Sequence, residues 1–141
     1  MNFTKLFVGT LIGGVVYFLL GWLVYGILLM DVMSIPEEFN SILYSEEEFN
    51  MVFMAVSCLV WGLLLTYVLL SWGGIKSFGA GLLPAAIIGA LVALSLGFSM
   101  ASMYKFSEVP NVLIDSVATA VISGITGGVI GWYLGRGKAG A

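Results

Sequence analysis

The sequence predicts an all-α membrane protein, a bundle of four transmembrane helices. Of its 141 residues, 60% are hydrophobic and only 9% are charged, whereas a soluble domain is about a quarter charged. Four segments carry no charged side chain: 6–30, 49–75, 77–104 and 116–135. Each is long enough to cross a hydrocarbon core about 30 Å thick, which takes about 20 helical residues. Because lipid offers backbone amides no hydrogen-bond partners, we expect every span to be helical.

These segments predict one transmembrane domain, residues 1–141, with spans at about 4–30, 48–72, 78–104 and 111–135. The apolar part of the first span is longer than the ~7–15 residues of a secretory signal core, so we expect it to be retained. Pro84 lies early in the third span, where it could kink the helix or begin it, and Pro110 lies at the start of the fourth span, where proline suits the first helical turn. The turn between the second and third spans is too short for a soluble domain.

Basic residues predict the orientation of the spans, because they resist translocation across the membrane. Four of the five lie on one side of the predicted bundle: Lys5, Lys76, Arg136 and Lys138. The opposite side holds the acidic loop 31–47, which has no basic residue, and a short loop with Lys105. We therefore expect a multi-pass protein of a bacterial inner membrane, with both termini cytoplasmic and the acidic loop facing outward.

The outer loop repeats the tetrapeptide Glu-Glu-Phe-Asn, and two capping boxes explain the repeat. Ser34 precedes Glu37 by three residues, and Ser45 precedes Glu48 in the same way. The second box predicts the start of the second span. The first box predicts a short amphipathic helix lying on the outer headgroup region with one apolar face: Ile35, Phe39, Ile42 and Leu43.

The carboxylates of this loop suggest two functional alternatives to helix capping. They are Glu37, Glu38, Glu46, Glu47 and Glu48. A calcium loop spaces its oxygens at alternate positions around a glycine, and this loop contains no glycine, so we predict no metal and no cofactor. The second alternative is a partner protein whose basic surface docks on the carboxylates. No nucleic-acid partner is predicted.

Nineteen glycines in so apolar a chain predict close contact between helix backbones, because lipid offers no hydrophobic drive for helices to associate. In the third span a small residue recurs every four positions: Gly81, Ala85, Gly89, Ala93, Gly97 and Ala101. The fourth span has two such rows, which include Gly124 and Gly128. We expect the third and fourth spans to form the tightest pair, the third span to contact a second neighbour, and the first span to meet the glycine-rich face of the fourth. The rows could instead be the seam of a homo-oligomer or a larger complex.

Chemistry inside a membrane needs titratable or ligating side chains, which are functional by default in lipid. The chain has no His and a single Cys, Cys58, so it lacks ligands for haem, zinc or a sulfur cluster. The charged residues nearest to the interior are Asp31, Lys105 and Asp115, which could form a cluster at the outer interface. Hydroxyl residues of the third and fourth spans could line a polar path, but such groups more often bond to the carbonyl of the preceding turn.

Three stretches show a family resemblance in their order and spacing: FLLGWLVYGILLMDVM (18–33), GLLPAAIIGALVALSLGFSMASMY, and NVLIDSVATAVISGITGGVIGWYLG (111–135). The motif Gly21-x-x-x-Tyr25-Gly26 and the acidic residue of Leu-Ile-Asp at 113–115 carry it. By these residues the chain resembles the bacterial four-span membrane family called domain of unknown function 1761, in its Bacteroidetes-type form. The family often has a tryptophan where this chain has Val24. The resemblance implies a fold and a membrane location without an activity, and it marks Asp115 as the first polar residue to mutate.

The sequence therefore predicts a non-enzymatic membrane protein, because the chain lacks a nucleophile–base pair. We expect it to act by packing among membrane lipids, as an accessory or assembly subunit or as a homo-oligomer. The alternative is a small transporter or channel in which Asp31 and Asp115 attract a cation at the outer mouth. A continuous polar cavity would favour transport, whereas helix contacts sealed by glycine favour assembly.

Overall fold

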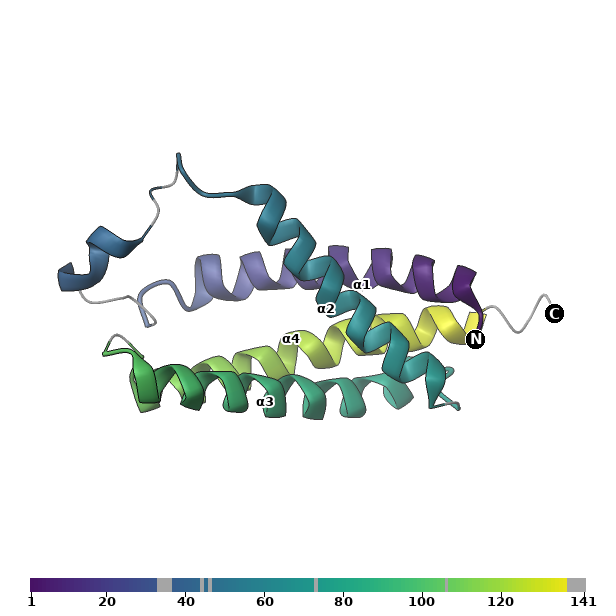
Figure 1. The fold of residues 1–141 in the computed structure, drawn as a ribbon. Helices are drawn as coiled ribbons and strands as arrows, with labels where there is room; N and C mark the ends of the chain where they lie inside the picture. The colour runs from purple at the N-terminus through teal and green to yellow at the C-terminus, as the bar shows by residue number, and fades with distance from the viewer. Residues whose placement is uncertain (33–36, 44, 46, 73, 106, 137–141) are drawn as a thin grey trace.

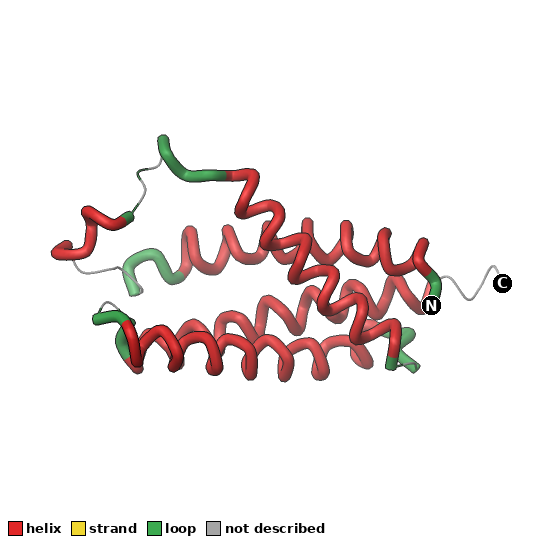
Figure 2. Tube along the Cα trace, in the orientation of Figure 1, coloured by secondary structure: helices red, strands yellow, loops and turns green. Residues whose placement is uncertain are grey.

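The computed structural model describes residues 1–32, 37–43, 45, 47–72, 74–105 and 107–136, which form four long helices (Figures 1 and 2). The helices are α1 (Phe3–Leu23), α2 (Met51–Ser71), α3 (Phe78–Met103) and α4 (Val109–Arg136). A π-helical turn, η1 (Val24–Leu28), extends α1, and a 3-10 helix, η2 (Glu37–Ile42), lies in the loop before α2. No strand occurs in these residues, so the all-α class is confirmed for the described part of the chain.

Each of the four helices is long and apolar enough to cross a membrane, with α1 and η1 together forming one span, Phe3–Leu28. The chain is therefore a four-span integral membrane protein. The first span ends two residues earlier than expected, and α2 begins at Met51 rather than at 48. Both differences lie beside the acidic loop, where the hydropathy of the sequence falls gradually.

The chain runs up and down the bundle, so that α1 and α3 point one way and α2 and α4 the other (Figure 1). The N-terminus, the turn between α2 and α3 and the end of α4 share one end of the bundle, which we call the termini end. The opposite, loop end holds η1, η2 and the turn between α3 and α4. The contact between α3 and α4 is the most extensive, followed by that between α1 and α2. α2 crosses α1, and its first turns stand away from the other helices (Figure 1).

Side-chain caps determine where three of the helices begin. Asn2, Asn50 and Ser77 each accept a 3.1 Å hydrogen bond from the backbone N–H three residues further on. The predicted box of Ser45 and Glu48 also forms, since the Glu48 N–H donates to Ser45 Oγ at 3.3 Å and the Ser45 N–H donates to Glu48 Oε2 at 3.2 Å. This box closes a turn ahead of α2 and does not start the helix, because Asn50 is the residue that caps it.

The amphipathic helix predicted in the outer loop is a short 3-10 helix, η2. Ser34 and Ile35, which would have begun it, lie outside the described residues. Of the apolar face, Ile42 and Leu43 are exposed and Phe39 is half-buried. In Figure 1, η2 lies beyond the loop end of the long helices.

Glycine brings the backbones of α3 and α4 into direct contact. A Cβ atom added at Gly127 would overlap the Ala85 methyl group and would lie 2.7 Å from the carbonyl oxygen of Gly81. A Cβ atom at Gly81 would in turn overlap the carbonyl oxygen of Gly127. Any larger side chain at either position would push the helices apart, which is how small residues allow close helix pairing in lipid.

The small-residue row of α3 faces α4 over most of its length. Four members are fully buried: Gly81, Ala85, Gly89 and Ala93. Gly97 is half-buried, and a Cβ atom there would lie 2.6 Å from Cγ1 of Val112. Ala85 also belongs to the apolar cluster that contains Leu65 and Leu69 of α2, but among the described residues the extensive contact of α3 is with α4.

The glycine face of α4 packs on α3 and not on α1, so that part of the expected arrangement was wrong. Gly124 faces Ala86, and Gly128 faces the ring of Phe78, both on α3. The glycines of α1 mainly meet α2: Gly9 lies against Thr66, and Gly13 and Gly14 lie against the backbone of Gly62. Gly13 also contacts Ile130, a large side chain of α4. The sequence alone could not decide which helix packs on the glycine face of α4, because small-residue rows on several helices fit one another equally well.

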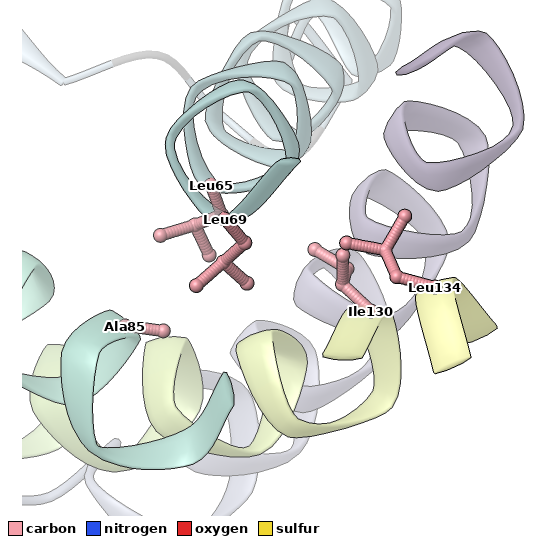
Figure 3. Close-up of a cluster of buried hydrophobic side chains, with 5 residues drawn as sticks. All are labelled: Leu65, Leu69, Ala85, Ile130 and Leu134. Carbon is pink, nitrogen blue, oxygen red and sulfur yellow. The ribbon is translucent and has the colours of Figure 1, made fainter. Parts of the chain in front are cut away.

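Large apolar side chains fill the space where α2, α3 and α4 meet. Figure 3 shows the cluster, with Leu65 and Leu69 from α2, Ala85 from α3, and Ile130 and Leu134 from α4. Most other large apolar side chains point out of the bundle, toward the lipid that surrounds a four-span protein. The interior is therefore narrow, and α4 is its most enclosed helix.

Candidate functional site

The bundle interior contains four buried hydroxyl side chains on α4: Ser116, Thr119, Ser123 and Thr126. Ser116 and Thr126 each donate a 2.8 Å hydrogen bond to the carbonyl oxygen four residues earlier in the same helix. Their polarity is thus satisfied locally. Thr119 and Ser123 instead bond to side chains of other helices, and these two residues locate the candidate site.

Thr119 belongs to a polar cluster that joins η1 to α4. The Tyr25 hydroxyl lies 2.6 Å from Asp115 Oδ1 and 3.0 Å from Thr119 Oγ1. Because a phenol carries a single proton, donating it to the carboxylate leaves the phenol oxygen to accept from the Thr119 hydroxyl. Asp115 and Tyr25 are both half-buried. The carboxylate is thus turned into the bundle and bonded to a neighbouring helix.

Ser123 belongs to a second cluster, one turn further along α4. The indole Nε1–H of Trp61, on α2, donates a 3.0 Å hydrogen bond to Ser123 Oγ. The ring of Tyr17, on α1, lies against Trp61 with a centroid distance of 5.6 Å and a tilt of 41°. Tilted aromatic pairs of this kind add attraction beyond the area that they bury. Three helices thus meet at Trp61.

A π-helical turn positions Tyr25 in the first cluster. The Leu29 N–H bonds to the Val24 carbonyl oxygen at 2.8 Å, five residues back. Such wider turns are rare and occur frequently at functional sites. Tyr17 and Tyr25 continue the four-residue spacing of Gly9 and Gly13, so α1 changes from glycine contacts near the termini end to tyrosine contacts near the loop end.

A groove of about 510 Å³ opens between α1 and α2 where α2 diverges at the loop end. Its volume falls within the roughly 300–1,000 Å³ typical of ligand sites. Its lining is almost entirely apolar and aromatic and includes Tyr17, Trp22, Tyr25, Met51, Met54 and Cys58. Gly21 lies in its wall with open space around it, because an added Cβ atom would meet no atom within 4 Å. We call this space the α1–α2 groove.

A second apolar groove, of about 490 Å³, lies on the other side of the α1 end, against α4. Its walls include Val24 and Leu28 from η1 and Leu113, Val117 and Val121 from α4. The Tyr25–Asp115 hydrogen bond joins η1 to α4 in the same part of the bundle. Both grooves are open, and both have an almost entirely apolar lining.

The structure does not assemble the predicted cluster of Asp31, Lys105 and Asp115. Asp31 and Lys105 are exposed, and the side chain that bonds to the Asp115 carboxylate is Tyr25, whose hydroxyl also bonds to Thr119. The sequence indicated the carboxylate but missed its partner, because Tyr25 comes from a distant span.

Tyr25 and Trp61 are the site residues that sequence reasoning did not identify. Tyr25 appeared in the sequence only within the Gly21-x-x-x-Tyr25-Gly26 motif of the family resemblance, which gave it no partner. A buried indole in lipid needs an acceptor, and that requirement could have directed attention to the hydroxyl residues of α4.

The acidic loop makes no cation site in the described residues. No group of three or more acidic, Cys or His side chains there is placed to hold a metal ion. Glu37, Glu38 and Glu47 are exposed, Glu48 bonds to the Ser45 N–H, and Glu46 lies outside the described residues. The carboxylates of Glu37, Glu38 and Glu47 thus lie on the surface of the loop.

Comparison with protein-family models, with curated proteins and with solved structures gives no match for this chain. The resemblance to domain of unknown function 1761 therefore stays a prediction.

Proposed function

We propose that this four-span protein is a non-enzymatic accessory subunit that acts by assembly within a membrane. The observation that carries the proposal is the shape of the bundle. α3 and α4 are in backbone contact at several glycines, whereas α1 and α2 touch at Gly62 and then diverge, which leaves the α1–α2 groove open to the surrounding lipid. A partner helix, or a second copy of the chain, would seat in this groove.

The small-residue rows do not supply the assembly surface. Gly81, Gly89 and Gly127 pack against neighbours within the same chain, so they are already used. The first turn of α2, by contrast, has no cover: the side chain of Phe53 is 73% exposed. Aromatic residues and methionine are enriched at protein interfaces, and both line the α1–α2 groove.

The orientation of the chain in the membrane belongs to the same proposal. The distribution of Lys and Arg favours a bacterial inner membrane with the termini end in the cytoplasm. The loop end, with the exposed carboxylates and the open part of the groove, would then face outward. A partner whose extracytoplasmic domain has a basic surface would then contact the exposed carboxylates at the same end of the bundle as the open part of the groove.

The test is co-purification in mild detergent, followed by mass spectrometry of the intact assembly, for a matched pair of variants. Gly21→Leu places a side chain in the groove without a clash, because no atom lies within 4 Å of its added Cβ. Gly79→Leu is the control, since Gly79 is equally open but lies at the other end of the bundle. We expect the unmodified chain and Gly79→Leu to retain the same partner, and Gly21→Leu to lose it. A lone monomer in all three preparations, or equal retention in all three, contradicts the proposal.

One observation favours the alternative of a small transporter: Asp115 is an acidic residue inside a span. The arrangement around it supports the subunit, because the carboxylate is bonded to Tyr25 and the neighbouring cavities are apolar. Cation flux into proteoliposomes separates the two functions. We expect no flux above that of empty liposomes, and a flux that is abolished by Asp115→Asn would establish transport.

A further inference from the structure

One side of α2 carries an apolar row along the whole helix, which we call the inner face of α2. Its members recur at intervals of three or four residues: Met51, Met54, Cys58, Gly62, Leu65 and Leu69. Positions spaced in this way share one side of an α-helix. Every member from Cys58 onward is buried, whereas Met51 is 56% exposed and Met54 is 41% exposed. The inner face is therefore covered in its second part and uncovered in its first.

The covered part of the inner face is an interface within the chain. Gly62 touches the backbone of α1. Leu65 and Leu69 pack with residues of α3 and α4 in the cluster of Figure 3. Toward the loop end α2 diverges from α1, and the inner face becomes one wall of the α1–α2 groove (Figure 1). The uncovered part is thus the continuation of an interface that already exists.

The opposite wall of the groove, on α1, also lacks cover. The buried residues of α1 are Gly9, Gly13 and Gly14, and none follows Gly14 in that helix. A glycine inside a helix costs about 1 kcal/mol relative to alanine. The three buried glycines make close contacts with neighbouring helices, whereas Gly21, in the groove wall, has no atom within 4 Å of an added Cβ atom. The open surface at Gly21 suits the close approach of a helix from another molecule.

The chemistry of the groove allows it to face a copy of itself. Its lining has no charged side chain and combines aromatic rings with the methionines of the inner face. Methionine is unbranched and polarisable, so two methionine-bearing faces can adapt to each other, and contacts between sulfur and aromatic rings add attraction. A two-fold pair brings the same surface patch of both copies together, and this symmetry is the commonest among homo-oligomers.

We propose that the partner in the α1–α2 groove is a second copy of this chain, paired through the uncovered part of the inner face of α2. Met51 and Met54 of one copy meet the same residues of the other copy across a two-fold axis. Gly21 lets the second α2 approach α1 closely. Both grooves are filled at once, so the assembly closes at two copies. This inference rests on the proposed assembly function and identifies its partner.

Cysteine cross-linking in membranes tests the pairing, in a Cys58→Ala background that removes the single native thiol. Met54→Cys should form a disulfide-linked dimer on mild oxidation, because the two copies of this residue face each other at the axis. Val56→Cys is the matched control. Val56 is 50% exposed and lies two residues further along α2, which places it on the opposite side of the helix. Val56→Cys should stay monomeric.

A second readout keeps Cys58 and uses two copies of the chain that carry different affinity tags. Purification on one tag in mild detergent should recover the other tag as well, and mass spectrometry of the intact assembly should show two copies. Gly21→Leu in both copies should lose the second tag. Gly79→Leu should retain it, because Gly79 is equally open but lies at the termini end.

The outcomes separate this inference from the proposed function. Equal cross-linking of Met54→Cys and Val56→Cys, or recovery of both tags with Gly21→Leu, overturns the two-fold pair. A single copy bound to a different protein, which Gly21→Leu releases, overturns the second copy as the partner while the proposed function holds. A single copy without any partner overturns both.

Discussion

The Tyr25 hydroxyl lies 2.6 Å from Asp115 Oδ1, and this hydrogen bond joins residues 90 positions apart in the chain. It connects the π-helical end of α1 to α4 in the half of the bundle where α2 has moved away. Thr119 completes the contact at 3.0 Å from the same phenol oxygen. The bond is therefore the main polar link that keeps α1 against α4 while the α1–α2 groove stays open.

Replacing Tyr25 by Phe should lower the free energy of unfolding by about 1–2 kcal/mol. A hydrogen bond to a charged group is worth about 1.5–3 kcal/mol, whereas interhelical bonds measured within membranes average about 0.6 and reach about 1.7 kcal/mol. Unfolding in mixed detergent micelles, followed by circular dichroism, measures the change. Tyr67→Phe serves as the control, because the Tyr67 side chain is 51% exposed on the lipid-facing side of α2. Equal effects of the two substitutions would show that the Asp115 contact contributes nothing.

Gly127→Ala should destabilise the pair formed by α3 and α4 by about 1–3 kcal/mol, the usual cost of overpacking. The added methyl would overlap Ala85 and press on the Gly81 carbonyl, neither of which can move without shifting a helix. Gly21→Ala makes the same chemical change in open space and should be neutral or stabilising by up to about 1 kcal/mol through helix propensity. Thermal unfolding of the two variants tests the contrast. A neutral Gly127→Ala would mean that the helices are not in direct contact there.

Asn50→Ala should loosen the first turn of α2, because Asn50 Oδ1 accepts the Phe53 N–H at 3.1 Å. Loss of an N-cap side chain costs about 1 kcal/mol. Hydrogen exchange at the Phe53 amide should become faster. Ser45→Ala should leave that amide unchanged, since the bonds between Ser45 and Glu48 close only the preceding turn. Faster exchange of the Phe53 amide in Ser45→Ala would assign the start of α2 to the earlier box.

Thr66→Val should stabilise the protein, by up to about 1 kcal/mol. Within the described residues, Thr66 Oγ1 is buried without a hydrogen-bond partner, and an unsatisfied buried group costs about 1–3 kcal/mol. Valine has nearly the same shape and removes the hydroxyl. Thr126→Val removes a hydroxyl that is satisfied at 2.8 Å by the Ile122 carbonyl, so this control should show no gain. The two melting temperatures should therefore move apart, and parallel shifts would count against the assignment.

Much of the fold follows from local composition. The four spans, their helical nature and the approximate helix ends could be predicted because each depends on one stretch of chain at a time. The caps show the limit of this reasoning: the Ser45–Glu48 box forms as its spacing suggests, yet Asn50, the residue nearest to the apolar run, begins α2. When two capping residues compete, the backbone path of the loop decides between them.

The candidate site could be predicted only in part. Asp115 stood out because a carboxylate in an apolar segment is costly and rarely accidental. Its partner was expected among the charged residues Asp31 and Lys105, and the structure supplies the phenol of Tyr25 instead. In lipid a hydroxyl group satisfies a carboxylate without adding a second charge, and hydroxyl groups are too common in the sequence to mark one in advance.

The sequence by itself determined that the chain crosses a membrane four times, that its charges lie near the span ends, and that its helices pack closely through small residues. Hydropathy is a property of each segment alone, so these features need no knowledge of neighbours. Only the tertiary structure decided which small-residue row meets which helix, that α2 diverges from α1, and that Tyr25 bonds to Asp115. Such relationships depend on how whole helices are rotated against one another, and in lipid several rotations bury small residues equally well until tertiary contacts select one.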